Sequence, residues 1–268
     1  MTEKKDRIAA MFAQQKAAGK KALITFITAG DPDIETTKRL VLGMEAAGAN
    51  LIELGVPFSD PVAEGPVIQA ADLRALSKGL RTDEIFNAVA ELRTKTQLPI
   101  VFMMYINCIY TYGKEKFFAR CADCGVDGVI VPDLPFEEKD EVQGEAQKQA
   151  VKVISLVAPT SHERVGMIAR EAEGFLYCVS SEGVTGVRKD FSTDFDAYFT
   201  AINKAANVPT ALGFGISGPE QARALRQYAD GLIVGSAIVR LVGAASSPDE
   251  AVNSVSAFVR SLRDAIDE

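Results

Sequence analysis

Three carboxylates stand close together in one short stretch of this chain. Glu53 lies within an apolar run at residues 50–56, and Asp60 and Glu64 follow in a loop rich in proline and glycine that begins at Pro57. A strand covered on both faces in a parallel sheet is normally a continuous apolar run. Burial disfavours the charged form of a carboxyl group and raises its pKa. Such a group can both donate and accept a proton near neutral pH, as general acid–base catalysis requires.

Glu53 also has two purely structural explanations. Its side chain could point into water, or it could pair with a lysine or an arginine. For a single acid in a strand, these explanations would be preferred. The further acids in the loop that follows the strand favour a catalytic role for Glu53 instead.

Three glycine-rich turns follow later apolar runs, at residues 180–189, 213–217 and 234–238. Glycine lets the backbone approach an anion closely, and the N-terminus of a helix attracts phosphate. The turn at residues 180–189 is also long enough to form a mobile lid. Each turn alone could simply be a tight turn that requires glycine. Together they favour a small-molecule substrate that carries a phosphate.

Eight candidate strands alternate with helical patterns, and no linker or low-complexity segment separates them. Strands are expected at residues 22–28, 50–56, 100–104, 128–131, 151–157, 174–179, 209–212 and 231–234. Helices are expected at residues 34–47, 82–95, 115–124, 137–149, 163–171, 194–205 and 219–228. This alternation implies parallel strands joined by right-handed crossovers.

Eight such units favour a single α/β domain, residues 1–268, built as a (β/α)8 TIM barrel with an extra N-terminal helix. A leading helix at residues 4–18 and a final one at residues 249–266 would pack outside the strands. The alternative, an open α/β sheet, usually carries a G-x-G-x-x-G turn after its first strand, and residues 28–32 lack it. In a barrel, catalytic residues lie at the carboxyl ends of the strands, and phosphate often binds after strands seven and eight.

Composition argues against several classes of protein. The net charge of −7 disfavours nucleic acid or an anionic membrane as a general partner. The N-terminus lacks an apolar signal segment and no apolar run could span a membrane, so a cytoplasmic location is expected. Cys121 and Cys124 form a C-x-x-C with no second pair, and His162 is the only histidine. Buried structural cysteines, no metal site and no Ser-His-Asp triad are therefore expected.

Several of these motifs occur together in one known family. Residues 52–69, the strand containing Tyr177 with the Gly-Val-Thr-Gly turn after it, and the turns at residues 213–217 and 235–238 closely resemble the tryptophan synthase α subunit. The likeness covers essentially the whole chain in the right order. It implies a TIM-barrel lyase that cleaves indole-3-glycerol phosphate to indole and glyceraldehyde 3-phosphate without a cofactor. It also implies an α2β2 complex with a pyridoxal-phosphate β subunit that makes tryptophan from indole and serine.

The resemblance assigns roles residue by residue. Glu53 matches the family's acid–base carboxylate, and Tyr177 matches a tyrosine of the site. Glu64 stands where the family usually has Asp, which accepts the indole N–H, and Asp60 matches a residue that organises the loop and contacts the partner. Further matches form the apolar wall for indole, the lid and the phosphate cradle: Phe26, Met103, Tyr105, Thr185, Gly186, Gly213, Phe214, Gly215, Gly235 and Ser236.

Two alternatives remain open at this point. Other phosphate-binding barrels share the glycine turns, although a Glu in the second strand followed by Phe-Ser-Asp-Pro is not expected in them. The second alternative is a catalytically weak α-like subunit that mainly binds and activates a β subunit, and Glu64 in place of Asp is its only support. Measuring indole release with and without a β subunit separates these possibilities.

Overall fold

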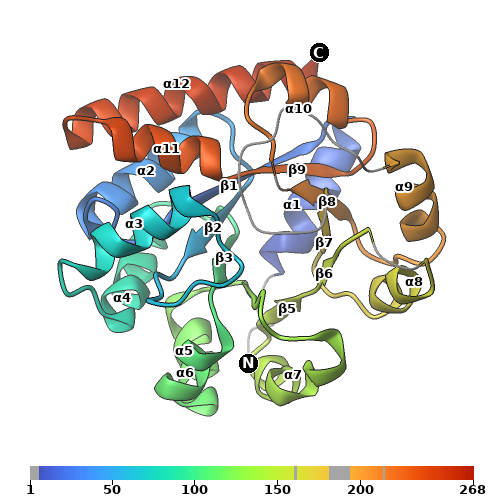
Figure 1. Cartoon of the computed structure of the whole chain (residues 1–268), viewed down its shortest axis with the longest axis horizontal. Helices are drawn as coiled ribbons and strands as arrows, with labels where there is room; N and C mark the ends of the chain where they lie inside the picture. The colour runs from blue at the N-terminus through green and yellow to red at the C-terminus, as the bar shows by residue number, and fades with distance from the viewer. Residues whose placement is uncertain (1–5, 160–161, 181–193, 214) are drawn as a thin grey trace.

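The structure, a computed structural model, describes residues 6–159, 162–180, 194–213 and 215–268. Within these residues, nine parallel strands follow the order β5-β4-β3-β2-β1-β9-β8-β7-β6 and form a nearly closed barrel (Figure 1). The strands are β1 (Ala22–Thr28), β2 (Leu51–Gly55), β3 (Ile100–Met103), β4 (Gly128–Ile130), β5 (Lys152–Ile154), β6 (Leu156–Val157), β7 (Leu176–Val179), β8 (Thr210–Gly213) and β9 (Gly231–Val234).

The strand predicted at residues 151–157 is the point where the barrel closes. Its first part, β5, pairs with β4, and its second part, β6, pairs with β7. Ser155 lies between them, and its carbonyl accepts a hydrogen bond of 3.0 Å from the Tyr177 N–H. One predicted strand therefore appears as two because it changes partner along its length. The other predicted strands are confirmed with small shifts at their ends, and so is the barrel.

Side chains along the strands alternate between the barrel interior and the surrounding helices. In β1, Ile24 and Phe26 belong to an inner apolar cluster, whereas Leu23 and Ile27 belong to an outer cluster beneath the helices. The interior of a small barrel is filled by such layers of side chains. Because both faces are apolar, the strands appear in the sequence as continuous apolar runs with no alternation of polar residues.

Helices surround the barrel (Figure 1). Those that match predicted patterns are α2 (Ile34–Ala46), α4 (Thr82–Leu92), α6 (Lys114–Cys124), α7 (Asp140–Lys148) with the 3-10 turn Phe136–Glu138 before it, α8 (His162–Arg170), α9 (Phe195–Asn203), α10 (Pro219–Leu225) and α12 (Pro248–Asp267). A further helix, α11 (Ser236–Ala244), begins within the glycine turn at residues 234–238. Two helices were not predicted, α3 (Pro66–Leu76) and α5 (Ile106–Tyr112). Pro66 occupies the first turn of α3, where its missing N–H costs nothing, so the helix starts directly after the acidic loop.

The N-terminal helix α1 (Arg7–Ala17) is present, but it does not pack outside the strands as expected. Its buried residues Ile8, Met11 and Phe12 belong to the inner cluster, and the Phe12 ring lies 5.8 Å from the ring of Phe175. The helix therefore closes the amino-terminal end of the barrel, and Figure 1 shows it across the middle of the ring. The expectation holds for α12, which packs on α2, α10 and α11.

The parallel strands bring their carboxyl ends together at the opposite end of the barrel. There Phe26 of β1, Glu53 of β2 and Val101 of β3 stand at the same level of the sheet. The loop that carries Asp60 and Glu64 joins β2 to α3 at this end. Among the described helices, none combines the length and apolarity that crossing a lipid bilayer requires.

Candidate active site

Glu53 is a buried acid inside the barrel. Its side chain is 1% exposed, and its Oε1 has no hydrogen-bond partner among the described residues. Burial, and then the charge of Glu64, raise the pKa of Glu53 from 4.5 to about 8. Neither structural explanation considered for this residue applies, since the side chain does not reach water and no described lysine or arginine pairs with it. At neutral pH the group is mainly protonated and can donate a proton.

Glu64 lies close to the other ionisable groups of this end of the barrel. It is 4% exposed, and its charge raises the pKa of Glu53 and of Asp72. Its position is held by the surrounding loop: the Gln69 side chain donates to the Glu64 carbonyl at 2.7 Å, and the Glu64 N–H donates to the Pro61 carbonyl at 3.1 Å. The Glu64 residue is thus buried at this end of the barrel, with its backbone fixed by these two hydrogen bonds.

Tyr105 supports the same loop. Its hydroxyl accepts a hydrogen bond of 2.9 Å from the Ala63 N–H, and its ring stacks on Phe58 with 5.1 Å between centroids. Burial and the charge of Glu64 raise the pKa of Tyr105 above its ordinary value, so the hydroxyl stays protonated. Tyr105 was predicted as part of the apolar wall, and this contact with the residue before Glu64 was not anticipated.

Tyr177 lies close to the two acids and to Gly213, the first residue of the second glycine turn. It is buried on β7, and burial followed by the charges of Glu53 and Glu64 raises its pKa well above 10. A Cβ added at Gly213 would lie 2.7 Å from the Tyr177 hydroxyl oxygen. The missing side chain at Gly213 therefore makes room for this hydroxyl next to the acids.

Asp72 is a third buried acid near this site, and the sequence reasoning did not identify it. It lies on α3, and its Oδ1 is 3.5 Å from the Thr28 hydroxyl. Burial and the charge of Glu64 raise the pKa of Asp72 to about 7, against the opposing hydrogen bonds from the Phe58 N–H and Thr28. The signal was available in the sequence, because Asp72 falls among Ile68, Ala71 and Ala75 on the apolar side of a helix.

One pocket brings most of the predicted residues together. It is lined by Phe26, Glu53, Ile68, Met103, Tyr177, Gly215, Ile216, Ile233, Gly235 and Ser236. The free space between these side chains is about 30 Å³, which holds about one or two water molecules. Three predicted residues, Thr185, Gly186 and Phe214, lie outside the described residues.

The glycine turns after β8 and β9 have the backbone that an anion site needs. Gly215 has a φ of +91°, a conformation that favours glycine. Gly235 is the N-cap of α11, and Ser236 begins that helix. The first N–H groups of a helix have no partner within it and carry the positive end of its dipole. Gly215, Gly235 and Ser236 line the same pocket as Glu53 and Tyr177.

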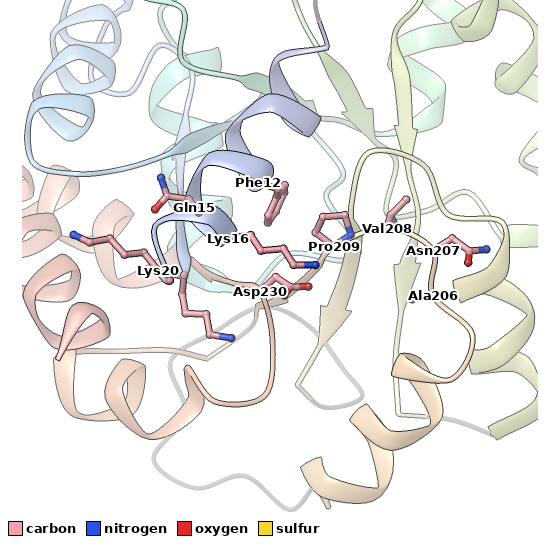
Figure 2. Close-up of a pocket in the computed structure, with 11 residues that line it drawn as sticks. Phe12, Gln15, Lys16, Lys20, Ala206, Asn207, Val208, Pro209 and Asp230 are labelled. Carbon is pink, nitrogen blue, oxygen red and sulfur yellow. The ribbon is translucent and has the colours of Figure 1, made fainter.

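A second pocket, of about 490 Å³, lies at the amino-terminal end of the barrel (Figure 2). It is lined by three lysines, Lys16, Lys20 and Lys21, which could in principle attract a phosphate. Lys20 points away from the pocket in Figure 2 and pairs with Asp267 at 2.8 Å. The acid that lines it, Asp230, accepts a hydrogen bond of 2.9 Å from the Thr210 N–H. This pocket offers no buried acid for proton transfer.

The described residues contain no group of three or more His, Cys, Asp or Glu side chains that could hold a metal ion. All four cysteines are free thiols. Cys121 and Cys124 are buried on α6, in agreement with the structural role expected for them.

Comparison with known proteins gives a consistent result over the whole chain. Residues 12–267 match the family described as tryptophan synthase alpha chain. The tryptophan synthase alpha chain of Caldanaerobacter subterraneus subsp. tengcongensis is 49% identical over 97% of this chain and 100% of its own length, and that of Thermoanaerobacter sp. (strain X514) is 48% identical with the same coverage.

Solved structures agree. The tryptophan synthase subunit alpha of Legionella pneumophila str. Paris superposes with a TM-score of 0.88 at 36% identity, covering 98% of this chain and 99% of that one. A Mycobacterium tuberculosis tryptophan synthase structure gives a TM-score of 0.88 at 30% identity, covering 97% of this chain and 98% of that one. The chain belongs to the tryptophan synthase alpha chain family.

Proposed function

We propose that Glu53 carries both proton transfers by which this member of the family cleaves indole-3-glycerol phosphate to indole and glyceraldehyde 3-phosphate in tryptophan biosynthesis. The observation that carries the proposal is a fully buried carboxyl group without a hydrogen-bond partner at Oε1 and with a pKa raised to about 8. It lies in the same pocket as Gly235 and Ser236, which supply backbone for a phosphate.

The reaction requires a proton donor in its first step and a proton acceptor in its second. Protonated Glu53 gives its proton to C3 of the indole, which leaves a positive charge on the ring. The resulting carboxylate then takes the proton of the glycerol hydroxyl next to C3. As that hydroxyl becomes a carbonyl, the carbon–carbon bond breaks and its electrons return to the ring. Glu53 ends in its starting form, so no cofactor is needed. A pKa near 8 allows both steps at neutral pH.

Glu64 is assigned the second role, accepting the indole N–H and stabilising the positive charge on the ring. Its buried position close to Glu53 and Tyr177 supports this role. Such a charge exists only during the reaction, so the interaction lowers the barrier without tightening substrate binding. The same observation counts against a catalytically weak subunit, because that alternative depended on Glu64 being misplaced.

Phe26 and Met103 form the wall against which the indole packs, and Tyr177 orients the substrate beside Glu53. The phosphate is bound by backbone N–H groups of Gly215, Gly235 and Ser236. Their common pocket supports this arrangement. Thr185, Gly186 and Phe214 keep the lid and cradle roles predicted from the resemblance.

The test is indole release by Glu53→Gln. An amide of the same shape cannot transfer the proton, so turnover should fall by at least about a thousandfold, or roughly 4 kcal/mol of barrier. Circular dichroism checks that the barrel is intact. Near wild-type turnover by the folded variant would refute the assignment.

The partner proposed for this chain is a tryptophan synthase β subunit in an α2β2 complex. The support is a set of exposed apolar side chains on the segments that follow β2 and β3: Val62 is 76% exposed, Leu73 65% and Tyr110 45%. Asp60 lies in the same loop as Val62 and was predicted to contact the partner. The cytoplasm remains the expected location.

Calorimetric titration with the β subunit tests this surface. Val62→Asp combined with Tyr110→Ser should raise the Kd at least about tenfold, because these changes remove buried apolar area and place a charge in the interface. Ala13→Asp, on the exposed side of α1 at the other end of the barrel, is the matched control. If the double variant and the Ala13→Asp control bound the β subunit with equal Kd, the β subunit would have to bind another surface.

A further inference from the structure

Asp72 lies where two segments that frame the site meet. It is buried on the inner side of α3, next to residues Ile68 and Ala71 of the inner cluster. Its carboxylate accepts hydrogen bonds from the hydroxyl of Thr28, the last residue of β1, and from the N–H of Phe58, near the start of the acidic loop. This one side chain therefore connects the loop to the carboxyl end of the neighbouring strand.

The loop between β2 and α3 has a second attachment. The Ala63 N–H donates to the Tyr105 hydroxyl at 2.9 Å, and the ring of Tyr105 stacks on Phe58. Asp72 and Tyr105 thus hold the loop near its two ends, at Phe58 and Ala63. Glu64 follows directly after Ala63. A change at either attachment is expected to move the Glu64 carboxylate.

The charged groups around Asp72 are mostly acidic. Glu64 and Asp31 both raise its pKa, while Asp72 in turn raises the pKa of Tyr105 and Cys108. Asp31 is paired with Arg74 through two hydrogen bonds of 2.8 Å, so that cation is already engaged. No lysine or arginine within the described ranges forms an ion pair with Asp72. Its ionisation is therefore opposed by burial and by Glu64, and favoured only by two hydrogen bonds.

We propose that Asp72 is a positioning residue for the cleavage reaction: its ionised carboxylate holds the loop that carries Glu64 against the end of β1, and protonation loosens that hold. Hydrogen bonds to an ionised acceptor are roughly twice as strong as those between neutral groups. The inference rests on the proposed function, because it assigns Glu64 a role in the reaction. It adds a residue that the resemblance did not include.

Ionisation of Asp72 and of Glu53 should make the reaction depend on pH in opposite directions. Asp72 loses its proton as the pH rises through about 7, so the loop tightens and kcat/KM rises. Glu53 loses its proton as the pH rises through about 8, so the general acid disappears and kcat/KM falls. Because kcat/KM reports ionisations of the free enzyme, its wild-type pH profile should have an ascending limb that belongs to Asp72 and a descending limb that belongs to Glu53.

The experiment measures kcat and KM for indole-3-glycerol phosphate with the full chain from about pH 5.5 to about pH 9. Asp72→Asn keeps an oxygen that accepts from Phe58 and Thr28 but carries no charge. Asp72→Ala removes both the charge and the acceptor, and Thr28→Val removes only one donor. Asp123→Asn, an exposed acid on α6, is the matched control.

Asp72→Ala should lower kcat by about tenfold while KM changes by less than about threefold. The kcat of Asp72→Asn, which keeps the acceptor but lacks the charge, should fall between those of Asp72→Ala and wild type, as expected for protonated Asp72, and its ascending limb near pH 7 should disappear while the descending limb stays. The kcat of Thr28→Val should lie between those of wild type and Asp72→Ala. If Asp72→Ala fails to fold, Asp72→Asn and Thr28→Val still test the inference.

An ascending limb near pH 7 that persists in Asp72→Asn would overturn the inference, and so would wild-type kcat in Asp72→Ala. These results are distinct from a failure of the proposed function. If Glu53→Gln is inactive while every Asp72 and Thr28 variant behaves like Asp123→Asn, only the positioning role is wrong. If Glu53→Gln stays active, the assignment of Glu53 is wrong whatever the Asp72 variants do.

Discussion

Replacing Glu53 by Gln should make the protein less active and more stable. In the folded state the pKa of Glu53 is about 8, whereas the ordinary value, taken for the unfolded chain, is 4.5. A carboxyl group whose pKa is raised on folding contributes fully to stability below pH 4.5, and that contribution is lost as the pH rises towards 8. Glutamine resembles the protonated acid in shape and does not titrate, so it avoids this loss.

The size of the effect follows from the two pKa values. Each pH unit between them changes the free energy of unfolding by about 1.4 kcal/mol. At pH 7 the free energy of unfolding of the wild-type protein is therefore roughly 3 kcal/mol lower than that of a chain in which position 53 stays neutral. This is a substantial fraction of the free energy of unfolding of a typical domain, which is roughly 5–15 kcal/mol.

Urea unfolding followed by far-UV circular dichroism at several pH values is the suitable assay, because the chain contains no tryptophan to report by fluorescence. Glu53→Gln and wild type should have similar urea midpoints near pH 4.5. The midpoint of the variant should then rise steadily above that of wild type up to about pH 8. Glu138→Gln, an exposed acid, controls for the loss of a negative charge. A difference between wild type and Glu53→Gln that does not change with pH would refute the reasoning.

Three further predictions concern other parts of the molecule. Glu64→Gln should lower kcat with little change in KM, and Glu64→Asp should stay within about tenfold of wild type; steady-state kinetics that place the loss in KM would contradict the assigned role. Gly235→Val should raise KM at least about tenfold, because a side chain there would occupy the place of the phosphate and meet Phe26, whose Cβ is 3.3 Å from an added Cβ. Asp127→Asn should cost about 3 kcal/mol of stability by leaving Arg7 and Arg93 without their partner, while kcat of the folded enzyme stays unchanged; unaltered urea midpoints would refute this.

The barrel could be predicted because its strands are buried on both faces. Such strands leave continuous apolar runs that stand out against the amphipathic helices. The position of α1 could not be predicted in the same way. Ile8, Met11 and Phe12 would suit an outer groove as well as the barrel end, and only the contact with Phe175 distinguishes the two. The change of partner at Ser155 likewise depends on closure of the whole ring.

Within the site, the sequence identified residues that carry unusual chemistry for their surroundings. Glu53 could be found because a carboxylate within an apolar strand has few explanations. The hydrogen bond from Ala63 to the Tyr105 hydroxyl, which supports the acidic loop, could not be predicted, because the two residues are 42 positions apart in the sequence. Asp72 was missed because α3 was not predicted. Only in a helix does Asp72 lie on the same side as its apolar neighbours and become buried with them.

The structure also separates two kinds of buried acid that look alike in the sequence. Asp127 precedes β4 and is held by Arg7 at 2.9 Å, by Arg93 at 2.8 Å and by the Ile100 N–H at 2.9 Å, so its charge is compensated at the amino-terminal end of the barrel. Glu53 and Asp72, at the other end, have no ion pair among the described residues, and their pKa values are raised to about 8 and about 7. A paired buried acid contributes to structure, whereas an uncompensated one lowers stability at neutral pH and is able to exchange protons there. The carboxyl end of the barrel, where Glu53 and Asp72 lie without an ion pair among the described residues, is therefore the end at which we expect the chemistry.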